Sequence, residues 1–190
     1  MASLLPIPSG PARAATRIER CPTIRPGFQP LLLRVRAQRQ RRKTSILTTI
    51  AEAQEELIEE FAFFDDWMDR YRYIIDLARN LPDFPAEWQT DENKVRGCQS
   101  QVWFVAEPGG EGRLKFHATS DAHIVSGLIA ILLRIYSGRT PDEILATKPD
   151  FVAAIGLDEH LSPTRNNGLH AMITRIYGEA KAAQASGAAA

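Results

Sequence analysis

The chain has 190 residues, and 23 basic side chains balance 23 acidic ones, so its formal net charge is zero. With 44% apolar and 8% aromatic residues it can bury the core of one domain, which excludes a wholly disordered chain. Two cysteines exclude a disulfide framework, and no apolar stretch reaches the roughly 20 residues of a membrane span, so we expect a soluble protein in a reducing compartment.

Residues 1–45 differ sharply in charge from the rest of the chain. They carry ten basic side chains against one acidic one, a net of +9, while residues 46–190 carry 13 basic and 22 acidic side chains, a net of −9. Six irregularly spaced prolines interrupt any regular element, so we expect a disordered basic extension. Two alternatives stay open: an organellar transit peptide, and contact of the run 34–43 with nucleic acid or anionic lipid.

Two helices are predicted after this extension. In the first, apolar residues recur at helical spacing among five glutamates, which predicts an amphipathic helix with an acidic outer face. These apolar residues are Ile50, Leu57, Phe61 and Phe64. The second helix is expected from about Asp66 to Asn80, where Leu81-Pro82 ends it.

A β-hairpin is predicted next. Apolar and polar residues alternate over 101–106 and again over 113–118, and the glycine-rich segment 107–112 between them is a strong turn signal. A further strand over 93–96 would make the antiparallel sheet three-stranded. Cys98 then lies in the connection from that strand to the hairpin, so we expect it on a loop.

A central helix is predicted after the hairpin. Its residues up to Tyr136 are apolar nearly all round, which is typical of a helix buried on every side. Ser120 or Asp121 is expected to cap its first turn.

The remaining residues are expected to form shorter helices and one long final helix. Residues 140–143 have the pattern of a capping box with proline at the first helical position. Another short helix is expected over 151–155, and Ser162-Pro163 opens the last helix. Two helices, a small antiparallel sheet and several further helices make the predicted fold class α+β.

Cys98 is the candidate for chemistry in the folded part. The thiol follows Gly97 and lies near two cations, Lys94 and Arg96, which favour thiolate over thiol, and a loop position allows attack on another sulfur. The competing interpretation is a small buried hydrophobe, since free cysteine is among the most buried residue types. Residue spacing alone leaves both interpretations open.

The sequence predicts no metal site of its own. The four histidines have no close pairing, there is no CxxC, and a scaffold that holds an iron-sulfur cluster needs about four ligands, mostly cysteines. A cysteine hydrolase needs a histidine within reach of Cys98, and nothing in the sequence places one there. These histidines are His117, His123, His160 and His170.

The segment around Cys98 resembles the active-cysteine segment of a known family. Val95-Arg96-Gly97-Cys98-Gln99-Ser100-Gln101-Val102-Trp103 is similar to that segment in the SufE family of sulfur-acceptor proteins. Further similar segments follow in the family's order between residues 55 and 182, whereas residues 1–45 have no counterpart. These segments are Asp66-Trp67, Arg70-Tyr71, Leu81-Pro82 and residues 120–130, 136–141, 160–165 and 167–169.

The resemblance implies sulfur transfer in iron-sulfur cluster assembly. SufE proteins take sulfane sulfur from a pyridoxal-phosphate cysteine desulfurase, SufS, as a persulfide, stimulate that enzyme and pass the sulfur to the SufBCD complex. It also implies an IscU-like α+β fold, with a small three-stranded antiparallel sheet packed against several helices. The chain would then be a persulfide carrier that works with an enzyme rather than a stand-alone enzyme.

The resemblance also assigns roles to individual residues. Cys98 is implied as the sulfur acceptor, and a moderately lowered pKa would suit its attack on the donor's persulfide. The other implied roles are support of the loop by Gly97, Gln99 and Ser100, and contact with a partner by Asp121, Arg165 and Arg96.

The remaining expectations concern organisation and partners. The SufE-like domain is expected to span 46–183, followed by a flexible tail over 184–190.

No cofactor is expected on this chain, because the pyridoxal phosphate belongs to the desulfurase. The expected partners are SufS or its close relative, the SufBCD complex and a second copy in a homodimer. Binding to a membrane or to nucleic acid is not expected. We expect a cytoplasmic protein, or an organellar one if residues 1–45 are a transit peptide. The alternative function is a non-catalytic allosteric activator of a desulfurase, with a structural Cys98.

Overall fold

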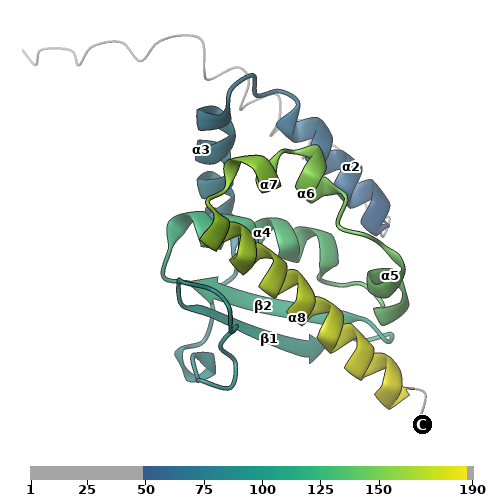
Figure 1. Cartoon of the computed structure of the whole chain (residues 1–190). Coiled ribbons are helices and arrows are strands. Elements are labelled where there is room, and N and C mark those ends of the chain that lie inside the picture. Colours follow the sequence, from purple (N-terminus) through teal and green to yellow (C-terminus); the bar gives the residue numbers. More distant parts are fainter. Residues whose placement is uncertain (1–48, 188–190) are drawn as a thin grey trace, which may run out of the picture. The chain divides into compact units, whose positions relative to one another are not determined.

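The computed structural model describes residues 49–187, which combine one β-hairpin with a set of helices (Figure 1). The fold class is α+β, as predicted. The elements are α2 (Ile50–Phe61), α3 (Trp67–Leu77), the 3-10 turns η1 (Ala78–Asn80) and η2 (Ala86–Trp88), β1 (Val102–Pro108), β2 (Leu114–Ser120), α4 (His123–Tyr136), α5 (Pro141–Ala146), α6 (Phe151–Ala154), α7 (Leu157–His160) and α8 (Pro163–Gly187). No helix in this part of the chain is both long and apolar enough to cross a membrane.

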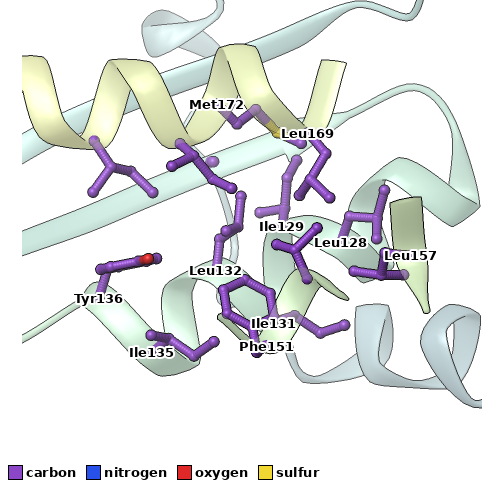
Figure 2. Packing of buried hydrophobic residues seen from close by; sticks show 14 of the residues in the cluster. Leu128, Ile129, Ile131, Leu132, Ile135, Tyr136, Phe151, Leu157, Leu169 and Met172 are labelled. Atoms are coloured by element: carbon purple, nitrogen blue, oxygen red, sulfur yellow. The ribbon is translucent and has the colours of Figure 1, made fainter. Parts of the chain in front are cut away.

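The central helix α4 organises the core. It contacts strand β2 on one side and helices α2 and α3 on another, so it lies between the hairpin and the N-terminal helices (Figure 1). Nine of its 14 residues are buried, which confirms the prediction of a helix covered nearly all round. In Figure 2, its Leu128, Ile129 and Leu132 face Leu169 and Met172 of α8, so the last helix closes the same core.

Helix α2 begins with a capping box. The Thr49 hydroxyl accepts from the backbone N–H of Glu52 at 3.2 Å, and the Glu52 carboxylate accepts from the N–H of Thr49 at 2.7 Å. The predicted acidic outer face is only partly outward. Glu56 and Glu60 turn toward α4, where Arg134 donates to both carboxylate oxygens of Glu60 at 2.6 and 2.9 Å and lies 3.5 Å from Glu56.

The sheet has two strands rather than the three expected. Strands β1 and β2 pair antiparallel from Val102 opposite Ser120 to Pro108 opposite Leu114. The expected strand over 93–96 forms only an isolated bridge, with two backbone hydrogen bonds of 2.8 Å to β1. A turn at 91–94 precedes it and the left-handed Gly97 follows it, so the extended stretch is too short for a ladder.

The cap of α4 also differs from the prediction. Its N-cap is Ala122, without any side-chain cap hydrogen bond. The Ser120 hydroxyl and the Asp121 carboxylate, which we expected at this cap, both bind the backbone of Gln101 instead.

The C-terminal helices follow the predicted starts. Thr140 and Glu143 form the expected capping box of α5, and α8 begins at Pro163. Helix α7 was not predicted; it begins after Gly156, whose φ of +78° is left-handed. Helix α8 continues to Gly187, past the boundary expected after residue 183. Residues 188–190 and the predicted extension over 1–45 lie outside the described residues.

Candidate functional site

Cys98 lies on the short loop that connects Lys94 to strand β1. Lys94 forms an isolated bridge with Trp103 of that strand. Val95 before it and Val102 after it are buried, so both ends of the loop are anchored in the core. Gly97 has a φ of +95°, a left-handed conformation that residues with a side chain rarely adopt. The glycine therefore makes a tight turn immediately before the thiol.

The far end of the loop is held through the backbone of Gln101. Its N–H donates to the Asp121 carboxylate at 3.0 Å, and its carbonyl oxygen accepts from the Ser120 hydroxyl at 2.8 Å. Asp121 thus connects the Cys98 loop to the start of α4. This positions the loop and corrects the expectation that Asp121 caps the helix.

The thiol of Cys98 rests against the second turn of α8. Its Sγ lies 3.6 Å from the backbone carbonyl oxygen of Gly168, to which the thiol donates. The two residues are 70 positions apart in the chain, so only the tertiary fold brings them together. Cys98 is half-buried in this position.

A cavity of about 320 Å³ opens beside Cys98. Buried apolar side chains of α4 and α8 line part of it, and polar side chains from the loop and from the start of α8 line the rest. Since a water molecule takes up about 30 Å³ in the liquid, the cavity has room for a further atom on the thiol. The lining residues are Cys98, Gln99, Ser100, Ala122, Ile124, Val125, Leu128, Ser162, Thr164, Arg165, Gly168 and Met172.

The structure brings some of the predicted site residues together and separates others. Gln99, Ser100 and Arg165 line the cavity with Cys98. The Arg165 guanidinium lies 6.0 Å from the centre of the Tyr71 ring, within reach of a cation–π contact. Arg96 is exposed and lines a different surface hollow, together with residues of α8 further from the cavity.

Burial raises the pKa of the Cys98 thiol above its ordinary value. This corrects the expectation of a thiol whose pKa is lowered by nearby cations. The Lys94 ammonium is turned toward the side chain of Gln101, to which it donates at 3.3 Å, and Arg96 is exposed to solvent. The loss of hydration therefore outweighs the attraction of these charges.

Alkylation of Cys98 in the free protein should accordingly depend on high pH. Because only the thiolate attacks iodoacetamide, the rate is expected to rise with pH to a midpoint above 9.0, the thiol's ordinary pKa. Stopped alkylation followed by peptide mass spectrometry measures this rate for Cys98 separately from Cys21. A midpoint below 9.0 would mean that Lys94 and Arg96 dominate after all.

Neither a metal site nor a catalytic histidine accompanies the thiol in the described residues. No three histidine, cysteine or acidic side chains there are close enough to hold a metal ion. None of the cavity-lining residues is a histidine. His117 packs on Trp88, and His160 stacks on Trp67 with ring centres 4.3 Å apart, so both rings have other neighbours.

Sequence reasoning missed the apolar side chains that line the cavity together with Cys98. The apolar pattern of α4 predicted that Val125 and Leu128 are buried, but it could not show that they border the thiol. Gly168 was the available signal, because a glycine inside a helix is unfavourable and calls for a local reason.

Comparisons with known proteins match this chain to one family. A family model described as "SufE: Fe-S metabolism associated domain" matches residues 55–180. A SufE-like protein of Rhizobium meliloti (strain 1021) is 50% identical over 131 residues, which cover 67% of this chain and 94% of that protein. A SufE-like protein of Rhizobium etli is 48% identical over 131 residues, 67% of this chain and 88% of that protein.

A solved structure resembles the fold as a whole. The solution structure of a hypothetical protein from Thermus thermophilus matches with a TM-score of 0.59, covering 70% of this chain and 96% of that one. Its sequence identity to this chain is 22%, so the match shows the fold alone.

Proposed function

The chain belongs to the SufE family of Fe-S metabolism, and from that premise we propose that it is a sulfur acceptor in iron-sulfur cluster assembly. In this proposal Cys98 takes sulfane sulfur from a pyridoxal-phosphate cysteine desulfurase of the SufS type, as a persulfide. The chain stimulates the desulfurase by removing its product, and delivers the sulfur to the SufBCD complex.

The observation that carries the proposal is the position of the Cys98 thiol at a cavity larger than the thiol itself. A cysteine that served only to fill the core would be surrounded by side chains without such a space. Here about 320 Å³ lies beside Sγ, bordered by apolar side chains such as Leu128 and Met172 and by polar ones from the loop and the start of α8. A second sulfur atom on Cys98 therefore has room in this cavity.

The transfer step balances without any oxidant or reductant. The Cys98 thiolate attacks the outer sulfur of the donor's persulfide, a new S–S bond forms on Cys98, and the donor's S–S bond breaks. The donor cysteine leaves as a thiolate. The sulfane sulfur changes its carrier, and its oxidation state is unchanged.

Cys98 must lose its proton before it attacks. Its cavity offers no base, because the residues that line it include neither a carboxylate nor an imidazole. The proton therefore goes to water or to a group of the docked desulfurase. Arg165 is the charged residue of this lining and can favour the thiolate.

The surface beside the cavity suits contact with another protein. Gln99 and Arg165 are exposed next to Cys98, and Arg96 is exposed on the same loop. We assign partner contact to Arg165 and Arg96, while Asp121 acts through its hydrogen bond to Gln101.

One observation favours a second candidate function. A half-buried thiol whose pKa is raised is also what a structural cysteine shows. In that case the chain would activate a desulfurase allosterically without carrying sulfur.

Mass spectrometry of the full chain tests the proposal directly. After incubation with a pyridoxal-phosphate cysteine desulfurase and cysteine, the peptide that contains Cys98 should gain one sulfur atom, which a reducing thiol removes. The Cys21→Ala variant should gain the same sulfur, because Cys21 lies outside the residues that match the family. Stimulation of the desulfurase without sulfur on Cys98 would favour the allosteric candidate.

A further inference from the structure

Gly168 occupies a helical position at which the backbone itself gives no reason for glycine. It lies buried in the second turn of α8, and its φ is not in the left-handed region. Glycine inside a helix is less favourable than alanine, because it loses more backbone freedom on folding. A neighbour that needs the space of the missing side chain would account for it.

That neighbour is Cys98. A Cβ atom placed on Gly168 would lie 3.3 Å from Cys98 Sγ and 3.8 Å from both the Cα and the Cβ of Cys98. The three nearest atoms thus all belong to one residue. The contact to Sγ is too tight, whereas the two contacts to carbon atoms are ordinary van der Waals distances. A Cβ at position 168 would therefore move the thiol away from α8 by a few tenths of an ångström and leave the loop backbone in place.

The backbone of Gly168 also acts on the protonation of the thiol. Its carbonyl oxygen accepts a hydrogen bond that only the protonated thiol can donate, at 3.6 Å. The charged groups near the thiol are Arg165 on α8, Arg96 and Lys94 on the loop, and Asp121 at the start of α4. Arg165 lies over the Tyr71 ring and Lys94 binds Gln101, so both have partners other than Sγ.

We propose that Gly168 is a positioning residue that seats the unloaded Cys98 thiol against α8: without a side chain at 168, Sγ packs against the helix and donates its hydrogen bond to the Gly168 carbonyl oxygen. This proposal rests on the proposed function, because a shielded thiol is useful to a protein whose thiol must react with one donor only. This contact between the thiol and α8, which we call the seat, is present in the chain without a partner. The seat exists because residue 168 has no side chain.

The pH profile of alkylation tests the seat. In Gly168→Ala the displaced thiol is more exposed and its hydrogen bond to the carbonyl is longer, so Cys98 should ionise at lower pH. We expect iodoacetamide to alkylate Cys98 about threefold faster at pH 8 than in the parent chain, which corresponds to a pKa lower by about half a unit. An alkylation profile identical to that of the parent chain would overturn the proposal.

Gly178→Ala is the matched control in the same helix. A Cβ placed on Gly178 meets nothing within 4 Å, so this substitution makes the same change to α8 without touching the loop. Its alkylation profile should match that of the parent chain. Equal acceleration in Gly178→Ala and Gly168→Ala would mean that helix stability, and not the seat, governs the thiol.

A double-mutant cycle with Cys98→Ala gives an independent reading. Removing Sγ leaves only the ordinary 3.8 Å contacts, so in the Cys98→Ala background Gly168→Ala should raise the midpoint of thermal unfolding through better helix propensity. With Cys98 present, the same substitution should lower that midpoint. The same change in both backgrounds would overturn the proposal, even if Gly168→Ala alone folds poorly.

Both measurements use the chain without a desulfurase. If these tests contradict the role of Gly168, mass spectrometry still decides whether Cys98 accepts sulfur. If Cys98 never gains sulfur, the alkylation profile and the cycle still decide whether Gly168 positions the thiol.

Discussion

Cys98→Ser is expected to abolish sulfur acceptance completely and to remove the stimulation of a cysteine desulfurase. A serine hydroxyl is not ionised at neutral pH and does not attack a sulfane sulfur, so position 98 no longer carries a group that can take the donor's persulfide sulfur. No other cysteine lies among residues 49–187, so none there can replace it. The measurement is desulfurase turnover with and without the chain, together with the mass of the chain after the reaction.

The Cys98→Ser variant should remain folded, which makes the loss of function interpretable. The side chain is half-buried, and the serine hydroxyl can still donate to the Gly168 carbonyl oxygen. We expect its free energy of unfolding to lie within about 1 kcal/mol of the parent value. If this variant still stimulates the desulfurase fully, sulfur carriage by Cys98 is wrong and the allosteric candidate explains the stimulation.

The elements of the fold were predictable wherever their signals are local. The capping box at Thr140, the proline at the start of α8 and the glycine-rich hairpin turn each act within a few residues, and the structure has all three. The expected third strand failed for a tertiary reason. Alternation predicts an extended segment, but its length as a strand depends on where the chain turns, and Gly97 turns it after two hydrogen bonds.

The reactive residue of the candidate site was predictable from the sequence, but the residues that surround it in space were not. The resemblance around Cys98 identified the thiol and its loop, but the burial of that thiol depends on Gly168, 70 residues further along. The neighbouring lysine and arginine suggested a lowered pKa because sequence distance was taken for distance in space. The pairing of Arg134 with Glu60, 74 residues apart, is invisible for the same reason.

Gly127→Ala is expected to cause a larger loss of stability than Gly168→Ala, whereas Gly178→Ala should cause no loss. A Cβ placed on Gly127 would overlap the carbonyl oxygen of Ile74 and would lie 2.7 Å from its carbonyl carbon and its Cγ2. Two of these atoms are backbone atoms of α3, so no side-chain rotation relieves the overlap. Helices α3 and α4 would have to move apart.

The cost of that movement should exceed the usual range for an added methyl group. Overpacking in a core costs about 1–3 kcal/mol where side chains can adjust, and here the backbone must shift, so we expect about 3 kcal/mol or more. The gain in helix propensity, about 1 kcal/mol, offsets only part of it. Denaturant unfolding measures the difference, with Gly178→Ala as the control that keeps only the propensity gain.

The same substitution connects the packing of the helices to the site. Leu128, which follows Gly127, lines the Cys98 cavity, and Tyr71 on α3 lies beneath Arg165. When α3 and α4 separate, Arg165 loses its ring and the inner wall of the cavity moves, so sulfur acceptance should fall even in the fraction that remains folded. A Gly127→Ala chain as stable as the parent chain would show that the close approach of α4 to Ile74 is not required by the fold.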